Sequence, residues 1–152
     1  MLYTAEDFWQ LAHAPGASEK CMELVRGQVI ESPLRGGYHG ELAAEIGLQV
    51  SRHIALNRLG YALAAGTGYV LFRDALLGDT VRAPDIGYIS HATLGGPLPD
   101  KFVSRAPDFP GIIVTPTELA EEVEEKVDDY LRAGVRLLWF VYPKSQSVYV
   151  YT

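Results

Sequence analysis

Two Pro-Asp dipeptides, each directly before a short apolar run, are the residues of this 152-residue chain best placed to do chemistry. Pro84-Asp85 precedes IGYIS, and Pro107-Asp108 precedes FPGIIV. A carboxylate at the start of a buried strand lies at the edge of a sheet, where a cation has access. Asp85 is therefore a candidate metal ligand. The alternative is that it is a turn residue that follows a proline.

Lys126 is the second candidate. Residues 119–133 have helical periodicity, and at 100° per residue Lys126 falls inside the apolar stripe, beside Tyr130. Its ammonium could stabilise negative charge that develops on a phosphate or on an attacking water. Alternatively, its stem covers apolar surface while the ammonium reaches water or pairs with Glu122 or Asp129. The two interpretations are compatible.

His39 and Glu23 are supporting candidates. His39 begins a helical pattern on the side of Leu42 and Ile46, so it should point inward, either as a donor to a phosphate or as a capping or core histidine. Glu23 has apolar neighbours in a predicted hairpin, where an unpaired charge would be costly. It either belongs to a site or faces solvent on the outer side of that hairpin.

Helix and strand patterns alternate along the chain and must position these residues. Thr4 and Asp7 predict a capped first helix, and Arg26-Gly27 predicts a hairpin with an exposed tip. Residues 39–57 and 119–133 predict two further helices, and HATLGGPLPD predicts a surface loop. Strands are expected in MELV, QVIES, DIGYIS, FPGIIV, VRLLWFVY and SVYVYT, with one or two more in YALAAGTGYVLFR. This order predicts an α/β or α+β fold with a mixed β-sheet.

Composition limits the classes of function. The net charge of −6 argues against strong nonspecific binding of nucleic acid, although it allows a local basic groove. The lone Cys21 cannot form an internal disulfide, and we find no secretion signal and no apolar run of membrane-spanning length. We therefore expect a soluble, cytoplasmic protein without a membrane partner.

Taken together, these motifs resemble the Uma-two family of restriction-endonuclease-like proteins, within the PD-(D/E)XK nuclease superfamily. The resemblance covers nearly the whole chain. It is carried by TAEDFWQL, MELVRGQVIES, YHGELAAEI, RAPDIGYIS, APDFPGIIVTP and EEKVDDYLRAGVRLLWFVYP.

The resemblance implies one restriction-endonuclease-like domain over residues 1–152, with a mixed β-sheet flanked by helices, that cleaves DNA. In such a domain Mg²⁺ or Mn²⁺ is held by two acids from adjacent strands, and Asp85 corresponds to the first acid. Lys126 corresponds to the catalytic lysine, moved from the second strand onto the following helix. The strand pattern runs to Tyr151-Thr152, so either it is an edge strand, which could pair in a homodimer, or a C-terminal extension is missing.

The second strand departs from the family pattern. Aligning Pro107-Asp108 and Thr115-Pro116 with the ends of the family's strand puts Ile112 where the second metal-binding glutamate is expected. Asp108 would lie about 13 Å from that position along the strand, and Glu118 could reach it only if its loop curls over the site. We therefore expect an impaired endonuclease or a noncatalytic binding module, unless FPGII is an alteration of an active sequence.

Overall fold

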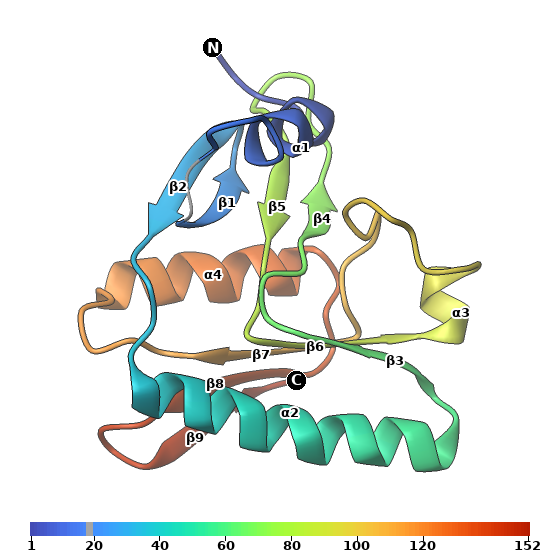
Figure 1. Cartoon of the computed structure of the whole chain (residues 1–152), viewed down its shortest axis with the longest axis vertical. Coiled ribbons are helices and arrows are strands. Elements are labelled where there is room, and N and C mark those ends of the chain that lie inside the picture. Colours follow the sequence, from blue (N-terminus) through green and yellow to red (C-terminus); the bar gives the residue numbers. More distant parts are fainter. Residues whose placement is uncertain (18–19) are drawn as a thin grey trace.

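Two β-sheets form the frame of the molecule, which we describe from a computed structural model over residues 1–17 and 20–152 (Figure 1). The smaller sheet has the order β2-β1-β5-β4, and the larger has the order β3-β6-β7-β8-β9. The smaller sheet comprises β1 (Cys21–Val25), β2 (Gln28–Ser32), β4 (Tyr69–Phe72) and β5 (Thr80–Arg82). The larger comprises β3 (Gly60–Leu63), β6 (Ile86–Ser90), β7 (Phe109–Ile113), β8 (Leu138–Tyr142) and β9 (Ser147–Tyr151).

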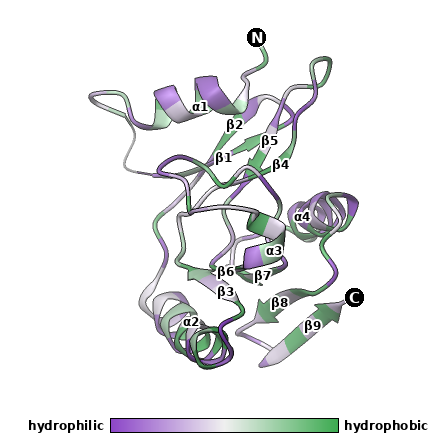
Figure 2. Ribbon diagram, turned by 90° about the vertical axis from the view of Figure 1, so that its right-hand side faces the viewer, coloured by the Kyte–Doolittle hydropathy of each residue, from purple (hydrophilic) through white to green (hydrophobic). Residues whose placement is uncertain are grey.

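Two long helices cover opposite faces of the larger sheet. Helix α2 (Gly37–Asn57) lies on one face and α4 (Ala120–Arg132) on the other, as Figures 1 and 2 show from two directions. The faces of β7 alternate accordingly, because Ile113 packs toward α2 and Ile112 packs toward α4. Helix α1 (Ala5–Ala12) packs on the smaller sheet through Ala5 and Phe8. None of the helices in the described part of the chain is long and apolar enough to span a bilayer.

The larger sheet is mixed, as the sequence predicts. Strands β6 and β7 are antiparallel, whereas β7 and β8 are parallel and are connected through α4. Ile86 pairs with Gly111, so the same register continued by one residue places Asp85 opposite Ile112. Asp85, the predicted first acid, and Ile112, at the position expected for the second acid, therefore face each other on adjacent strands.

The local patterns at the N-terminus are confirmed, with one correction. Thr4 Oγ1 accepts from the Asp7 amide at 3.1 Å, and Asp7 Oδ2 accepts from the Thr4 amide at 2.9 Å. The hairpin turns at Arg26 and Gly27, both with positive φ (46° and 71°). Its tip is not fully exposed, however. Gly27 is buried because Tyr3 and Asp79 hydrogen-bond its carbonyl and amide, each at 2.8 Å.

The predicted loop HATLGGPLPD begins with a single helical turn, α3 (His91–Leu94). Ser90 caps this turn by accepting from the Thr93 amide at 3.1 Å, and Gly95 ends it with a φ of 72°. The glycines and prolines that follow dominate the sequence pattern, so one turn of helix is hard to recognise before them.

The unusual strand FPGII is intact, although it holds a proline and a glycine. The ladder with β6 covers residues 109–111, and the ladder with β8 covers residues 111–113. The two ladders overlap only at Gly111, so Pro110 faces a strand partner on the β6 side alone. A proline in this place costs less than one inside two complete ladders.

Candidate functional site

Asp85 lies directly before β6, at the end of the larger sheet where α2 begins. Its Oδ2 accepts a hydrogen bond from the Ile113 amide at 2.8 Å. Ile113 is the last residue of β7 and lies beyond the end of β6, so the carboxylate provides the acceptor that β6 does not. Burial raises the pKa of this carboxyl. The Ile113 amide and the charges of His39, Arg35 and Lys126 act in the opposite direction. Asp85 thus has a structural role and also faces several cationic groups.

His39 points inward from the first turn of α2, as predicted. Its Nε2 lies 3.2 Å from the Ile113 carbonyl oxygen and 3.4 Å from Asp85 Oδ1. An imidazole in this place can donate to the Ile113 carbonyl and, when protonated, can form an ion pair with Asp85. The structure therefore brings two of the predicted site residues together.

Lys126 forms an ion pair with Glu118 through Nζ and Oε1. Both side chains are largely covered, at 17% and 8% exposure. Glu118 lies in the loop after β7, and its Oε2 accepts from the Thr115 amide at 3.3 Å. The loop thus brings Glu118 into contact with Lys126. Lys126 was expected to pair with Glu122 or Asp129. Instead, Glu122 accepts from the Leu119 amide, and Asp129 accepts from Arg82.

Glu23 faces inward and not toward solvent, which excludes the solvent-facing interpretation. Arg82 donates from Nη1 to Glu23 Oε2 at 3.0 Å, and the Ala83 amide donates to Glu23 Oε1 at 2.7 Å. Arg82 also donates from Nη2 to Asp129 Oδ2 at 2.7 Å. Arg82 is only 3% exposed. Burial alone would lower the pKa of Arg82, but the charges of Glu23 and Asp129 outweigh it and raise that pKa.

Arg82 and Asp129 were missed as a pair at the sequence level. A charged residue inside the buried strand TVR was the available signal, since an arginine between apolar neighbours needs a partner. The identity of that partner depends on the packing of α4 against β5, which sequence patterns do not reveal.

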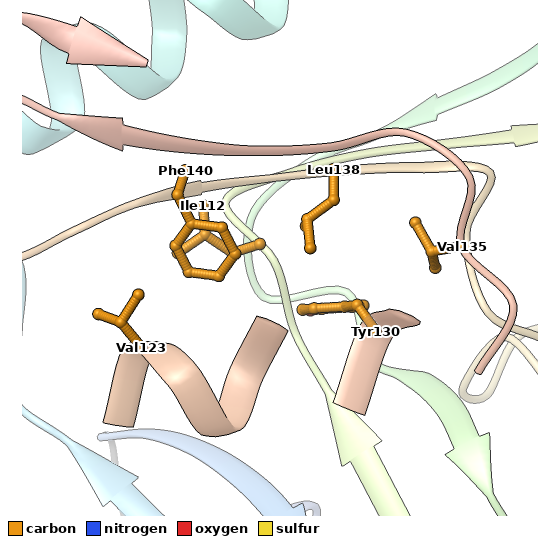
Figure 3. Close-up of a cluster of buried hydrophobic side chains, with 6 residues drawn as sticks. All are labelled: Ile112, Val123, Tyr130, Val135, Leu138 and Phe140. Atoms are coloured by element: carbon orange, nitrogen blue, oxygen red, sulfur yellow. The ribbon is translucent and has the colours of Figure 1, made fainter. Parts of the chain in front are cut away.

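Ile112 is part of the apolar core. It is 5% exposed and lies beside Phe140, with Val123 of α4 facing both (Figure 3). Tyr130, Val135 and Leu138 complete the same cluster. Isoleucine has no donor atom for a metal, and the neighbours of Ile112 are apolar.

A polar cavity of about 260 Å³ lies between the hairpin β1–β2 and the start of α4. It is lined by Glu23, Arg82, Glu118 and Lys126, together with Arg35 and three further glutamates, Glu31, Glu122 and Glu125. A larger cavity of about 1050 Å³ lies between α4 and the hairpin β8–β9, and its lining is mostly apolar. Two of the candidates, Glu23 and Lys126, line the smaller cavity, whereas Asp85 and His39 are not among its lining residues. Because its lining is polar and holds Lys126, we take the smaller cavity as the candidate site.

The donor groups do not fit a two-acid metal centre. Among residues 1–17 and 20–152 there is no cluster of three or more His, Cys, Asp or Glu side chains arranged to hold a metal ion. Asp85 is engaged with Ile113 and Glu118 with Lys126, while Ile112 is apolar. The arrangement does bring the Lys126 ammonium and the buried Asp85 carboxylate to one end of the sheet.

Asp108 lies at the opposite end of the β6–β7 pair. Its Oδ2 accepts from the Ser90 amide at 2.6 Å, and its Oδ1 accepts from Thr93 Oγ1 at 2.8 Å. This placement agrees with the sequence-based estimate that Asp108 is too far away to share a metal with a group at position 112.

The chain belongs to a family of nuclease-like proteins: residues 5–152 match the Uma2 family, described as "putative restriction endonuclease". No curated protein sequence matches the chain. The fold is similar to the crystal structure of a putative nuclease belonging to DUF820 from Anabaena variabilis ATCC 29413, with a TM-score of 0.77. The two are 22% identical, and the match covers 98% of this chain and 79% of that one. The predicted family and the mixed α+β fold are thus confirmed.

Proposed function

We propose that the chain carries the remnant of a metal-dependent DNA endonuclease centre, impaired by the replacement of its second acid. Asp85 is the retained first acid and Lys126 the retained lysine, with His39 and Glu23 beside them. In an intact centre, Mg²⁺ or Mn²⁺ would supply the charge that activates a water against a phosphodiester. In this chain, Asp85 provides one carboxylate and Lys126 one positive charge.

One observation carries the proposal, namely the register of β6 and β7. That register puts Asp85 opposite Ile112, so an acid at position 112 would stand beside Asp85. Lys126 lies close enough to lower the pKa of the Asp85 carboxyl, against the larger effect of burial. Family membership supports the same assignment.

Cleavage of supercoiled plasmid in Mg²⁺ or Mn²⁺ tests the proposal. We expect Ile112→Glu to gain at least about tenfold in rate over the unmodified chain, equivalent to about 1.4 kcal/mol of transition-state stabilisation. Ile112→Gln is the matched control, because it has the same shape as the glutamate without its charge. Asp85→Ala in the Ile112→Glu background should remove the gain.

Circular dichroism of each variant must accompany the assay, because a glutamate among Phe140 and Val123 has a desolvation cost. If folded Ile112→Glu neither cuts DNA nor binds Mn²⁺ more tightly than Ile112→Gln, the endonuclease assignment fails.

A noncatalytic binding module is the second candidate. Two observations favour it: Ile112 is part of the apolar core, and Lys126 is already paired with Glu118. This alternative predicts DNA binding without cleavage for the unmodified chain and for Ile112→Glu alike. Gel-shift and cleavage assays on the same samples separate it from the first candidate. A homodimer through the edge strand β9 stays a prediction that sedimentation would test.

A further inference from the structure

The pairing of Lys126 is the feature of the cavity that a phosphate ligand would have to change. Its ammonium is in direct contact with Glu118, and neither side chain is more than one fifth exposed. A carboxylate that neutralises a lysine occupies the position that a phosphate oxygen would take beside the same lysine. As long as this pair holds, Lys126 offers little free charge to an incoming phosphodiester.

We propose that Glu118 is an internal counterion that autoinhibits the cavity, by holding Lys126 in the ion pair that a DNA phosphodiester would otherwise form. The inference rests on the proposed function for its ligand, DNA. It concerns the resting state of the cavity and does not depend on a bound metal.

The charge of the cavity supports this role. Among the described residues, its lining has five glutamates against three cations, Arg35, Arg82 and Lys126. Arg82 is already bound to Glu23 and Asp129, so Lys126 and Arg35 are the cations of this described lining that can meet an anion. A phosphodiester that enters must therefore overcome an acidic lining and displace Glu118 as well.

The loop that carries Glu118 is held by short-range contacts. Glu118 Oε2 accepts from the Thr115 amide at 3.3 Å, and the Glu118 amide donates to the Thr115 carbonyl at 3.2 Å. Both contacts lie within one turn of the chain, between the end of β7 and the start of α4. The carboxylate can thus leave Lys126 through a local change in this loop, without separating α4 from the sheet.

The experiment compares Glu118→Gln with Glu122→Gln. Each variant removes one negative charge from the same cavity lining. Glu122 Oε2 accepts from the Leu119 amide, however, and within residues 1–17 and 20–152 it forms no ion pair or hydrogen bond with Lys126. Two measurements are made in EDTA. The first is the rate of reductive methylation of Lys126, followed by mass spectrometry. The second is the affinity for a fluorescein-labelled DNA duplex, followed by anisotropy.

We expect Glu118→Gln to speed up methylation of Lys126 several-fold and to tighten DNA binding about fivefold to tenfold. Glu122→Gln should change both by less than about twofold. In a Lys126→Gln background, Glu118→Gln should no longer tighten binding, because the cation that it releases is absent.

Three results have distinct meanings. Unchanged methylation in Glu118→Gln overturns the proposal. Faster methylation with unchanged DNA affinity, in a protein that does bind DNA, also overturns it, because the released lysine then does not serve the ligand. Faster methylation when no variant binds DNA supports the counterion role of Glu118 and instead contradicts the DNA ligand of the proposed function.

Discussion

The two Pro-Asp dipeptides have the same structural role at opposite ends of one pair of strands. Asp85 accepts from the amide of Ile113, the last residue of β7, and Asp108 accepts from the amide of Ser90, the last residue of β6. Because β6 and β7 are antiparallel, an aspartate placed before each strand reaches the end of the other. Each carboxylate thus accepts from the last backbone amide of the neighbouring strand. That amide lies beyond the end of the carboxylate's own strand, so no strand carbonyl accepts from it there.

The surroundings of the two carboxylates differ. Asp108 has the hydroxyl of Thr93 as its second partner. Asp85 faces His39 and the charges of Arg35 and Lys126, and it follows closely after the buried Arg82. A shared sequence motif therefore explains the local hydrogen bond, whereas the neighbours contributed by α2 and α4 decide which end could do chemistry.

The largest expected effect comes from the buried charges beside the Asp85 end. Arg82→Met should lower the free energy of unfolding by about 3–5 kcal/mol, because Glu23 and Asp129 would remain buried without their guanidinium. Arg132→Met, which breaks the exposed pair with Asp128, should cost less than about 1 kcal/mol. Guanidinium denaturation measures both. Equal losses would mean that the buried ion pairs of Arg82 contribute no more to stability than the exposed pair of Arg132.

The next effect concerns the Asp108 end. Asp108→Ala should cost about 2–3 kcal/mol, since the Ser90 amide and the Thr93 hydroxyl lose a charged acceptor together. Asp108→Asn keeps an acceptor oxygen and should retain most of that stability. Urea denaturation of both variants is the measurement. A cost for asparagine as large as that for alanine would contradict the capping role.

The smallest effect is a dependence on pH at the Asp85 end. Burial raises the folded-state pKa of this carboxyl. The neutral form is therefore favoured in the folded protein, so its stabilising contribution is complete below the unfolded pKa, about 3.9, and is lost as pH rises through the folded pKa. Asp85→Asn should remove this loss, so the variant gains stability relative to the unmodified chain between acidic and neutral pH.

Denaturation midpoints at several pH values measure this difference. His39 faces the same carboxylate, so the series should be repeated in a His39→Gln background, in which the Asp85 carboxyl titrates without this neighbour. A stability difference between Asp85→Asn and the unmodified chain that is constant with pH would show that burial does not control this carboxyl.

The sequence predicts the elements whose signals are local. The capped α1, the Arg26-Gly27 turn, the apolar face of α2 and the helix that carries Lys126 all rest on residues within a few positions of one another. The division into two sheets was not predicted, because it depends on β1 pairing with β5, more than fifty residues later. Alternating patterns predict strands but not their partners.

The candidate site likewise has residues whose placement the sequence predicts and contacts that it does not predict. The inward direction of His39 followed from helical periodicity, and the place of Ile112 inside a strand followed from the Pro-Asp and Thr-Pro motifs that flank it. The ion pair between Lys126 and Glu118 could not be derived, because it depends on how the loop after β7 bends. The interpretation of Glu23 as solvent-facing failed for a similar reason, since its partner Arg82 comes from β5.

The Arg82 network also limits the order in which the chain can fold. Its members come from β1, β5 and α4, with sequence separations of 59 residues to Glu23 and 47 residues to Asp129. Until α4 is synthesised, a collapsed N-terminal portion would have to leave the Arg82 cation exposed or incompletely paired. The smaller sheet therefore reaches its final packing only after Asp129 has left the ribosome, so an early half of this protein should not be stable by itself.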